Sequence, residues 1–204
     1  MTKLKICGLF RIEDADYANA ALPDYIGFVF AHSRRQVTPT QAAAIRQRLD
    51  ARIQAVGVFV DAAAEDIAAL AANGVIDVIQ LHGSEDAAYI ERLRSITAAP
   101  IVKAVRVQSS QQVLAAQDMP CDYLLLDAYH PQLAGGSGEC FDWSLLPELA
   151  KPYFLAGGID SRNIREALKH KPYAIDVSSG AETNGVKDKN KIVELTKIAR
   201  SVTI

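Results

Sequence analysis

Residues 153–158 read YFLAGG and residues 174–180 read AIDVSSG, so each run begins apolar and ends in glycine or serine. Each apolar run predicts a buried strand, and each small-residue ending predicts a loop. Between them Ile164, Ala167 and Leu168 recur at helical spacing, with Asp160 or Ser161 placed to cap the helix. Residues 153–180 therefore predict two strands joined by a helix, with a small loop after each strand.

The two loops predict a phosphate-binding site. Without bulky side chains, their backbone N–H groups can approach a ligand closely, and clustered N–H groups and helix N-termini bind anions. The candidate residues are Gly157, Gly158, Ser179 and Gly180. The alternative is that these glycines only make tight turns. Two such loops after consecutive strands favour the site, because adjacent parallel strands would bring the loops side by side.

The remainder of the chain repeats the alternation of strands and helices. The strands are near-continuous apolar runs, as is typical of strands buried on both faces. We predict strands at Leu4–Cys7, Tyr25–Phe30, Ala55–Val60, Val78–Leu81, Ile101–Val107, Tyr123–Leu126, Tyr153–Ala156 and Ala174–Val177. We predict helices at Thr40–Leu49, Ala63–Ala72, Asp86–Leu93, Ser110–Ala116, Ser144–Ala150, Arg162–Leu168 and Ile192–Ala199, and the longest loop at Tyr129–Cys140.

Eight strand–helix units predict an α/β fold of one of two kinds, a closed (β/α)8 TIM barrel or an open doubly wound sheet. We favour the barrel, because it explains eight similar units and places an anion site after strands seven and eight, where barrels often hold phosphate. No linker or repeat divides the chain, so we predict one compact domain spanning residues 1–204.

Composition excludes several classes of protein. Half of the residues are apolar and 23% are charged, with a formal net charge of -2, which argues against non-specific binding of nucleic acid. Three cysteines, Cys7, Cys121 and Cys140, form no close pair, so we expect a reducing compartment and no disulfides. No metal-binding motif, signal peptide or membrane-length apolar run is present. We therefore predict a cytoplasmic protein without metal or membrane partners.

Reactive side chains stand where the strands end, and in a barrel these positions build the active site. Cys7, Gln80, His82 and Asp127 occupy such positions. A lone cysteine in a strand is usually a small hydrophobic residue, but Cys7 directly precedes a glycine at a strand end, which favours a function. Asp127 could cap a turn; yet a carboxylate after three leucines must be paired, solvated or functional.

Arg34 and Arg35 follow the second strand. They could be a solvated pair, or they could bind a carboxylate in a bidentate fork. The sequence thus predicts a thiol, a carboxylate, an arginine pair and a phosphate site around one cavity, which suits a small phosphorylated substrate.

The motifs in their order resemble the phosphoribosylanthranilate isomerases of tryptophan biosynthesis over essentially the whole chain. The residues that carry the resemblance are KICGL at 5–9, GFVF at 27–30, SRR at 33–35, GVFV at 57–60, VIQLHG at 78–83, LLD at 125–127, GGSG at 135–138, FDW at 141–143, LAGG at 155–158 and DVSSG at 176–180. Phe10, where the family more often has threonine, and Ala181, where valine is more usual, depart from the pattern.

The resemblance implies an Amadori rearrangement of an aldose-amine, N-(5-phosphoribosyl)anthranilate, to a ketose. It implies that Asp127 is the general acid that protonates the ring oxygen, and that Cys7 is the general base that removes a proton from C2. The protonated Schiff base formed on ring opening is an internal electron sink, so no metal or organic cofactor is implied.

The resemblance also implies how the substrate is held. Arg35 matches the contact to the anthranilate carboxylate, and Gly157, Gly158, Ser179 and Gly180 match the phosphate loops. Gln80, His82 and Asp176 line the mouth of the barrel in a supporting role. Relatives from mesophiles are commonly monomers, so we expect a monomer.

The chemistry requires a thiolate at Cys7 and a protonated Asp127, the reverse of their ordinary states at neutral pH, so the site must lower one pKa, raise the other, or work through a minor population. We expect nearby lysine or arginine to lower the pKa of the Cys7 thiol, and burial beneath Leu124–Leu126 to favour the neutral Asp127. The expected dependence of kcat/KM on pH is bell-shaped.

Three other functions fit part of the pattern. An isomerase of the histidine pathway acting on an aminoimidazole ribotide has similar chemistry. Its family has aspartates at both catalytic strand ends, whereas this chain has Cys7 at the first of them. A non-catalytic barrel that binds a phosphorylated metabolite would need the loops but not Cys7 opposite Asp127. A thiol redox protein would need a resolving cysteine near Cys7, and the sequence has none.

Overall fold

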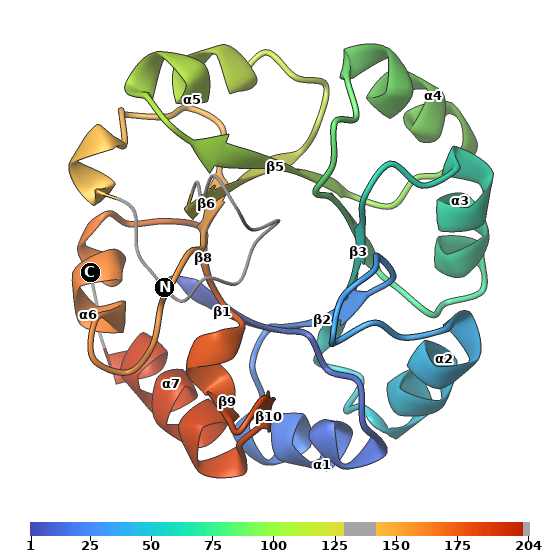
Figure 1. The fold of residues 1–204 in the computed structure, drawn as a ribbon, viewed down its shortest axis with the longest axis vertical. Coiled ribbons are helices and arrows are strands. Elements are labelled where there is room, and N and C mark those ends of the chain that lie inside the picture. The colour runs from blue at the N-terminus through green and yellow to red at the C-terminus, as the bar shows by residue number, and fades with distance from the viewer. Residues whose placement is uncertain (129–141, 202–204) are drawn as a thin grey trace.

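Eight parallel strands close into a barrel ringed by helices in the computed structural model, which describes residues 1–128 and 142–201 (Figure 1). The strands are β1 (Lys3–Cys7), β2 (Tyr25–Val29), β3 (Gln54–Phe59), β4 (Val78–Leu81), β5 (Ile101–Val107), β6 (Tyr123–Ala128), β7 (Tyr153–Leu155) and β8 (Ala174–Val177). Because β1 pairs with both β2 and β8, the sheet has no free edge. The predicted barrel is confirmed, and the open doubly wound sheet is wrong.

Helices cover the outer face of the barrel, one after each strand except β6 in the described part of the chain (Figure 1). They are α1 (Ile12–Ala21), α2 (Pro39–Arg48), α3 (Ala64–Ala72), α4 (Ala87–Ile96), α5 (Ser110–Ala116), α6 (Ile164–Lys169) and α7 (Lys189–Ser201). Thr38, Asp86 and Ser109 each accept a hydrogen bond from a backbone N–H three residues on, so each caps the helix that follows it. Within the described ranges, no helix combines the length and the apolarity that crossing a membrane requires.

Helix α1 was not predicted, because its short, alanine-rich sequence shows no clear apolar stripe. Asp14 organises its first turn instead: one carboxylate oxygen accepts from the backbone N–H groups of Phe10 and Arg11, each at 3.0 Å, and the other accepts from the Arg11 guanidinium at 2.7 Å. Leu22, in the left-handed region at φ 55°, ends the helix.

The helix predicted at 144–150 is wrong. Only a single 3-10 turn, η1 (Trp143–Leu145), forms there, with Asp142 accepting from the N–H of Ser144. Pro147 stops it, since proline lacks an N–H and holds the preceding residue in an extended conformation, as seen at Leu146.

The predicted cap of α6 is also wrong. Asn163 is the cap residue, while Asp160 closes the preceding turn by accepting from the N–H of Arg162 at 2.8 Å. The predicted loop at 129–140, its GGSG motif, Cys140 and Phe141 lie outside the described residues.

Side chains on each strand alternate between the barrel interior and the helices. At the amino ends of the strands the interior is filled by apolar and aromatic residues, among them Tyr25, Val102, Leu125 and Phe154. This packing floors the barrel, so an internal cavity can open only at the carboxyl ends of the strands, the usual place of an active site in this fold.

Candidate active site

A cavity of about 550 Å³ opens at the carboxyl ends of the strands. Nearly all of the predicted site residues line it, although they come from distant parts of the chain. They are Cys7, Arg35, Gln80, His82, Asp127, Gly157, Gly158, Asp176 and Ser179. We call this space the mouth cavity. Gly180 alone among the predicted site residues is not part of its lining.

Cys7 ends β1 and lies 8% exposed at the wall of the mouth cavity. Gly27 on β2 leaves room for it, because a Cβ at position 27 would lie 2.7 Å from the Cys7 sulfur. Burial raises the pKa of the Cys7 thiol, and the nearby ammonium of Lys5 offsets this only in part. Neighbouring lysines do act to lower this pKa, as expected, but the loss of solvation outweighs their attraction, so the net shift of the pKa is upward.

Lys5 is fully buried inside the barrel. Its Nζ donates to Oδ2 of Asp176 at 2.9 Å and to Oε1 of Gln80 at 2.8 Å. Burial acts to lower the pKa of Lys5, but the charges of Asp176 and Cys7 prevail and raise it. Lys5 thus remains a cation beside Cys7. Sequence reasoning missed this role, although a lysine in the middle of an otherwise apolar strand is a signal.

Asp127 lies across the cavity, where β6 ends. Its Oδ1 accepts from the N–H of Ala128 at 2.9 Å, and its Oδ2 lies 3.4 Å from Nε2 of His82. On its other side the His82 ring meets Gln80, with 2.9 Å between Nδ1 and the amide nitrogen. The acid candidate is therefore held by its own strand and by two residues of the β4 end.

The two glycine and serine loops pack backbone against backbone beside these groups. Gly157 and Gly158 have φ of 88° and 61°, a region that side chains rarely allow, and a Cβ on Gly157 would lie 2.8 Å from the backbone nitrogen of Ala128. A Cβ on Gly180 would lie 2.0 Å from the carbonyl oxygen of Ile159. Gly180 is thus required for the close approach of the two loops, and the lining at this point belongs to Ser179.

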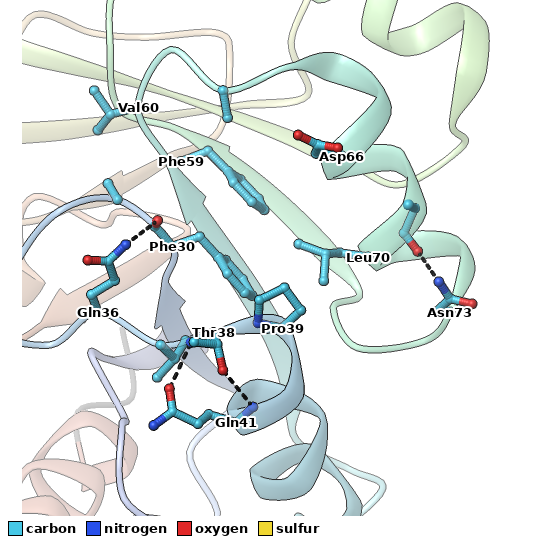
Figure 2. Close-up of a pocket in the computed structure, with 14 residues that line it drawn as sticks. Phe30, Gln36, Thr38, Pro39, Gln41, Phe59, Val60, Asp66, Leu70 and Asn73 are labelled. Carbon is cyan, nitrogen blue, oxygen red and sulfur yellow. Dashed lines mark hydrogen bonds between the residues drawn. The ribbon is translucent and has the colours of Figure 1, made fainter.

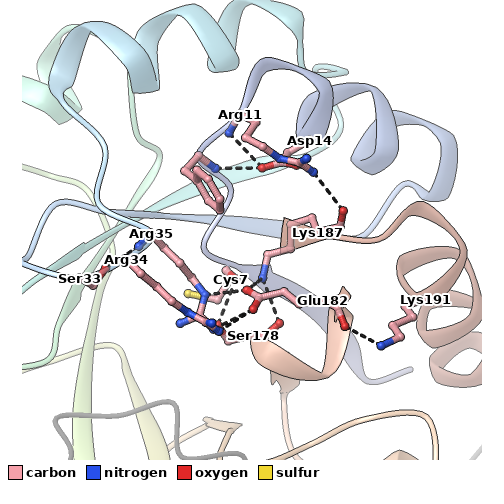
Figure 3. A network of polar contacts seen from close by, with 11 residues as sticks. Cys7, Arg11, Asp14, Ser33, Arg34, Arg35, Ser178, Glu182, Lys187 and Lys191 are labelled. Atoms are coloured by element: carbon pink, nitrogen blue, oxygen red, sulfur yellow. Dashed lines mark hydrogen bonds and ion pairs between the residues drawn. The ribbon is translucent and has the colours of Figure 1, made fainter. Parts of the chain in front are cut away.

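A cluster of charges centred on the buried Glu182 lies beside Cys7 (Figure 3), and Arg35 is the member of it that lines the mouth cavity. Glu182 accepts from Nε of Arg35 at 2.6 Å, from Nη2 of Arg34 at 2.7 Å and from Nζ of Lys187 at 2.8 Å. Burial acts to raise the pKa of Glu182, but Arg35 and Lys187 more than offset it, so the pKa is lowered. Burial lowers the pKa of Lys187.

Sequence reasoning missed both Glu182 and Lys187. They lie on a short hairpin of β9 (Glu182–Thr183) and β10 (Val186–Lys187) that follows the last barrel strand. Their only sequence signal is that the hairpin directly continues a predicted phosphate loop.

A second hollow, of about 700 Å³, lies outside the barrel between α2 and α3 (Figure 2). Its floor is the stacked pair Phe30 and Phe59, with ring centroids 5.0 Å apart, and Leu70 and Pro39 stand beside it. Among the described residues, Asp66 is the one acidic residue in its lining, and no lysine, arginine, histidine or cysteine joins it there. The described lining of this hollow thus lacks the acid and base pair that the mouth cavity contains.

Fold and site together define a (β/α)8 barrel whose polar cavity holds a buried thiol opposite a carboxylate. Residues 4–198 match the family model described as N-(5'phosphoribosyl)anthranilate (PRA) isomerase. The chain is 49% identical to the N-(5'-phosphoribosyl)anthranilate isomerase of Endomicrobium trichonymphae, over 99% of this chain and 100% of the relative. The chain therefore belongs to the N-(5'-phosphoribosyl)anthranilate isomerase family.

Solved structures agree. The phosphoribosyl anthranilate isomerase of Thermotoga maritima superposes with a TM-score of 0.86 at 32% identity, covering 99% of this chain and 100% of that one. A further structure, 31% identical with a TM-score of 0.83, covers 99% of this chain and 100% of its own. It is a complex of phosphoribosyl anthranilate isomerase with reduced 1-(o-carboxyphenylamino)-1-deoxyribulose 5-phosphate.

Proposed function

We propose that this barrel converts N-(5'-phosphoribosyl)anthranilate to 1-(2-carboxyphenylamino)-1-deoxyribulose 5-phosphate, an Amadori rearrangement in tryptophan biosynthesis. Membership of the isomerase family supports the reaction, and the relative that binds a reduced form of the product supports the substrate. Within this chain, one observation carries the proposal: Cys7 and Asp127 line the same cavity, next to the two glycine and serine loops. We further propose that the protein acts as a monomer in the cytoplasm.

Asp127 acts as the general acid. It gives its proton to the furanose ring oxygen, the ring opens, and the C1–N bond becomes a protonated Schiff base. Cys7 acts as the general base and takes the proton from C2, so that an enolamine forms and then tautomerises to the ketone. The raised pKa of Cys7 means that little thiolate is present at neutral pH, but the thiolate that forms is the stronger base.

Binding groups surround this pair. The loops at Gly157, Gly158 and Ser179 hold the phosphate, and Gly180 keeps the two loops in contact. Arg35 holds the anthranilate carboxylate. Glu182 occupies the Nε and Nη2 edge of its guanidinium, at 2.6 and 3.0 Å, which leaves the opposite edge for the substrate.

Gln80, His82 and Asp176 support the pair from the cavity wall. Asp176 is 8% exposed, and its Oδ1 is buried without a hydrogen-bond partner among the described residues. We propose that this oxygen accepts a hydrogen bond from a hydroxyl group of the sugar, because a buried carboxylate oxygen is costly when it accepts no hydrogen bond.

The decisive experiment is turnover of freshly prepared phosphoribosylanthranilate, followed by the loss of anthranilate fluorescence, with and without a chelator. We expect turnover that the chelator does not change. The same protein should not act on the aminoimidazole ribotide substrate of the histidine pathway. Binding of phosphoribosylanthranilate without any turnover would overturn the proposal in favour of a metabolite-binding barrel.

A further inference from the structure

A line of four polar side chains crosses the barrel interior from a buried cation to Asp127. Nζ of Lys5 lies 2.8 Å from Oε1 of Gln80, and Nε2 of Gln80 lies 2.9 Å from Nδ1 of His82. Nε2 of His82 lies 3.4 Å from Oδ2 of Asp127. The line therefore connects β1, β4 and β6 and ends on the candidate acid.

The direction of each hydrogen bond in this line is determined by its first member. An ammonium group can only donate, so Gln80 must turn its oxygen to Lys5 and its NH₂ group to His82. An amide NH₂ group can also only donate, so Nδ1 of His82 must accept and carries no proton. The neutral ring then carries its proton on Nε2, the nitrogen that faces Asp127.

The other states of the ring are disfavoured by the same contacts. A proton on Nδ1 would point at the NH₂ group of Gln80, so that two donors would oppose each other in a water-poor interior. The Nδ1–H tautomer would in addition turn the lone pair of Nε2 toward the Asp127 carboxylate. Lys5 cannot turn away to relieve this, because it is fully buried and also bonded to Asp176.

We propose that Gln80, oriented by Lys5, is a positioning residue that fixes His82 as the Nε2–H tautomer, and that His82 thereby serves as a hydrogen-bond donor to the general acid. This role rests on the proposed function of Asp127. As the O–H bond of Asp127 breaks and the ring oxygen gains the proton, a carboxylate is left behind, while His82 keeps its own proton. An N–H aimed at Oδ2 stabilises that charge, as the N–H of Ala128 does at Oδ1.

The 3.4 Å step between His82 and Asp127 is the longest in the line. Hydrogen bonds of catalytic groups are often long before substrate is bound and shorten in the complex. The donor is therefore in place before the reaction, and the negative charge that forms on Asp127 strengthens the bond at the moment it is needed.

The tautomer can be read directly from the ¹⁵N chemical shifts of histidine in the labelled protein, with His82 assigned as the signal lost in His82→Gln. We expect an unprotonated Nδ1 and a protonated Nε2. In Gln80→Glu a carboxylate faces Nδ1 and accepts a hydrogen bond from it, which favours a proton on Nδ1 and shifts the ring away from the neutral Nε2–H state. We expect kcat to fall about 10- to 100-fold, the usual range for a residue that orients an active group, with little change in KM.

Gln111→Glu is the matched control, since it adds the same charge at an exposed position on α5. It should leave both the ¹⁵N signals and kcat unchanged, and thermal unfolding of each variant should show that the barrel is intact. A protonated Nδ1 in the unmodified protein would overturn the proposal, and so would a folded Gln80→Glu with altered ¹⁵N signals but normal kcat. If the unmodified protein showed the Nε2–H tautomer but no turnover, the isomerase function would fail while the tautomer assignment stood.

Discussion

Two lysines on β1, Lys3 and Lys5, stand two residues apart and face the same barrel interior, yet their surroundings are opposite. Nζ of Lys3 lies over the rings of Tyr25 and Tyr173, at 5.3 and 5.1 Å from their centroids. Lys5 contacts a carboxylate and an amide, with no exposed surface. The contrast divides the interior into an aromatic end that holds the strands together and a polar end where chemistry is possible.

Aromatic side chains dominate the first of these ends. The Tyr123 and Tyr173 rings lie 4.7 Å apart, and Phe154 meets both at 5.6 to 5.7 Å. A hydrogen bond to Tyr173 raises the pKa of Tyr123 to about 12, so the Tyr123 hydroxyl stays neutral over the physiological range. Substitutions at the aromatic end should therefore lower the stability of the fold, whereas substitutions at the polar end should lower kcat or raise KM.

The largest effect is expected at the polar end. Cys7→Ser and Asp127→Asn should each reduce kcat by at least ~10²-fold, because each removes a general acid or base, while thermal unfolding stays close to that of the unmodified protein. Cys121→Ser is the control, since this buried cysteine lies outside the mouth cavity. Near-normal turnover by Cys7→Ala would mean that another group is the base.

The aromatic end should respond in the opposite way. Phe154→Ala removes a buried ring from the barrel floor and should lower the free energy of unfolding by about 3–5 kcal/mol in urea titrations. The kcat of the fraction that remains folded should not change, because Phe154 does not line the mouth cavity. A loss of kcat at full folding would mean that the two ends are not independent.

Within the polar end, Arg35 and Arg34 should differ. Arg35→Met should weaken substrate binding by ~2–3 kcal/mol, the range for a charge-assisted pair, seen as a higher KM. Arg34 shares the Glu182 contact, but its side chain is 57% exposed and does not line the cavity, so Arg34→Met should have little effect. The reverse result would assign the carboxylate contact to Arg34.

The pH profile tests the balance at Cys7. Because burial raises the pKa of this thiol, the thiolate forms only as pH rises past the ordinary cysteine value of about 8.5. The active form pairs this thiolate with a protonated Asp127, and in such a bell-shaped profile the limb at higher pH follows the group with the higher pKa. The falling limb of kcat/KM should therefore lie above that value, and Lys5→Met should move it still higher by removing the opposing charge. A falling limb below pH 8 in the unmodified protein would show that the cations outweigh burial.

The smallest effect is expected from Lys3→Met. The loss of its contacts with two tyrosine rings should cost about 0.5–1 kcal/mol of stability, and kcat should be unchanged. Paired with Lys5→Met, this variant tests whether the same substitution, moved two residues along one strand, changes from a stability effect to a catalytic one.

Much of the fold and site followed from local pattern. Apolar runs located all eight strands, and the carboxyl ends of those strands located Cys7, His82 and Asp127. Neither the apolar runs nor the strand ends could identify the partners of Lys5, since Gln80 is 75 and Asp176 is 171 residues away in the sequence. The predicted direction of the Cys7 pKa shift was wrong for a related reason. The balance of burial against charge depends on packing that no local sequence pattern encodes.

Ring closure also decides when the site comes into existence. Strand β1 is synthesised before β8, but β8 supplies the second neighbour of β1 and the carboxylate beside Lys5. Until β8 has left the ribosome, β1 has an open edge, which is a liability for mispairing, and Lys5 lacks its counter-ion. The thiol at the end of the first strand therefore acquires its chemical setting only after the last barrel strand has been synthesised.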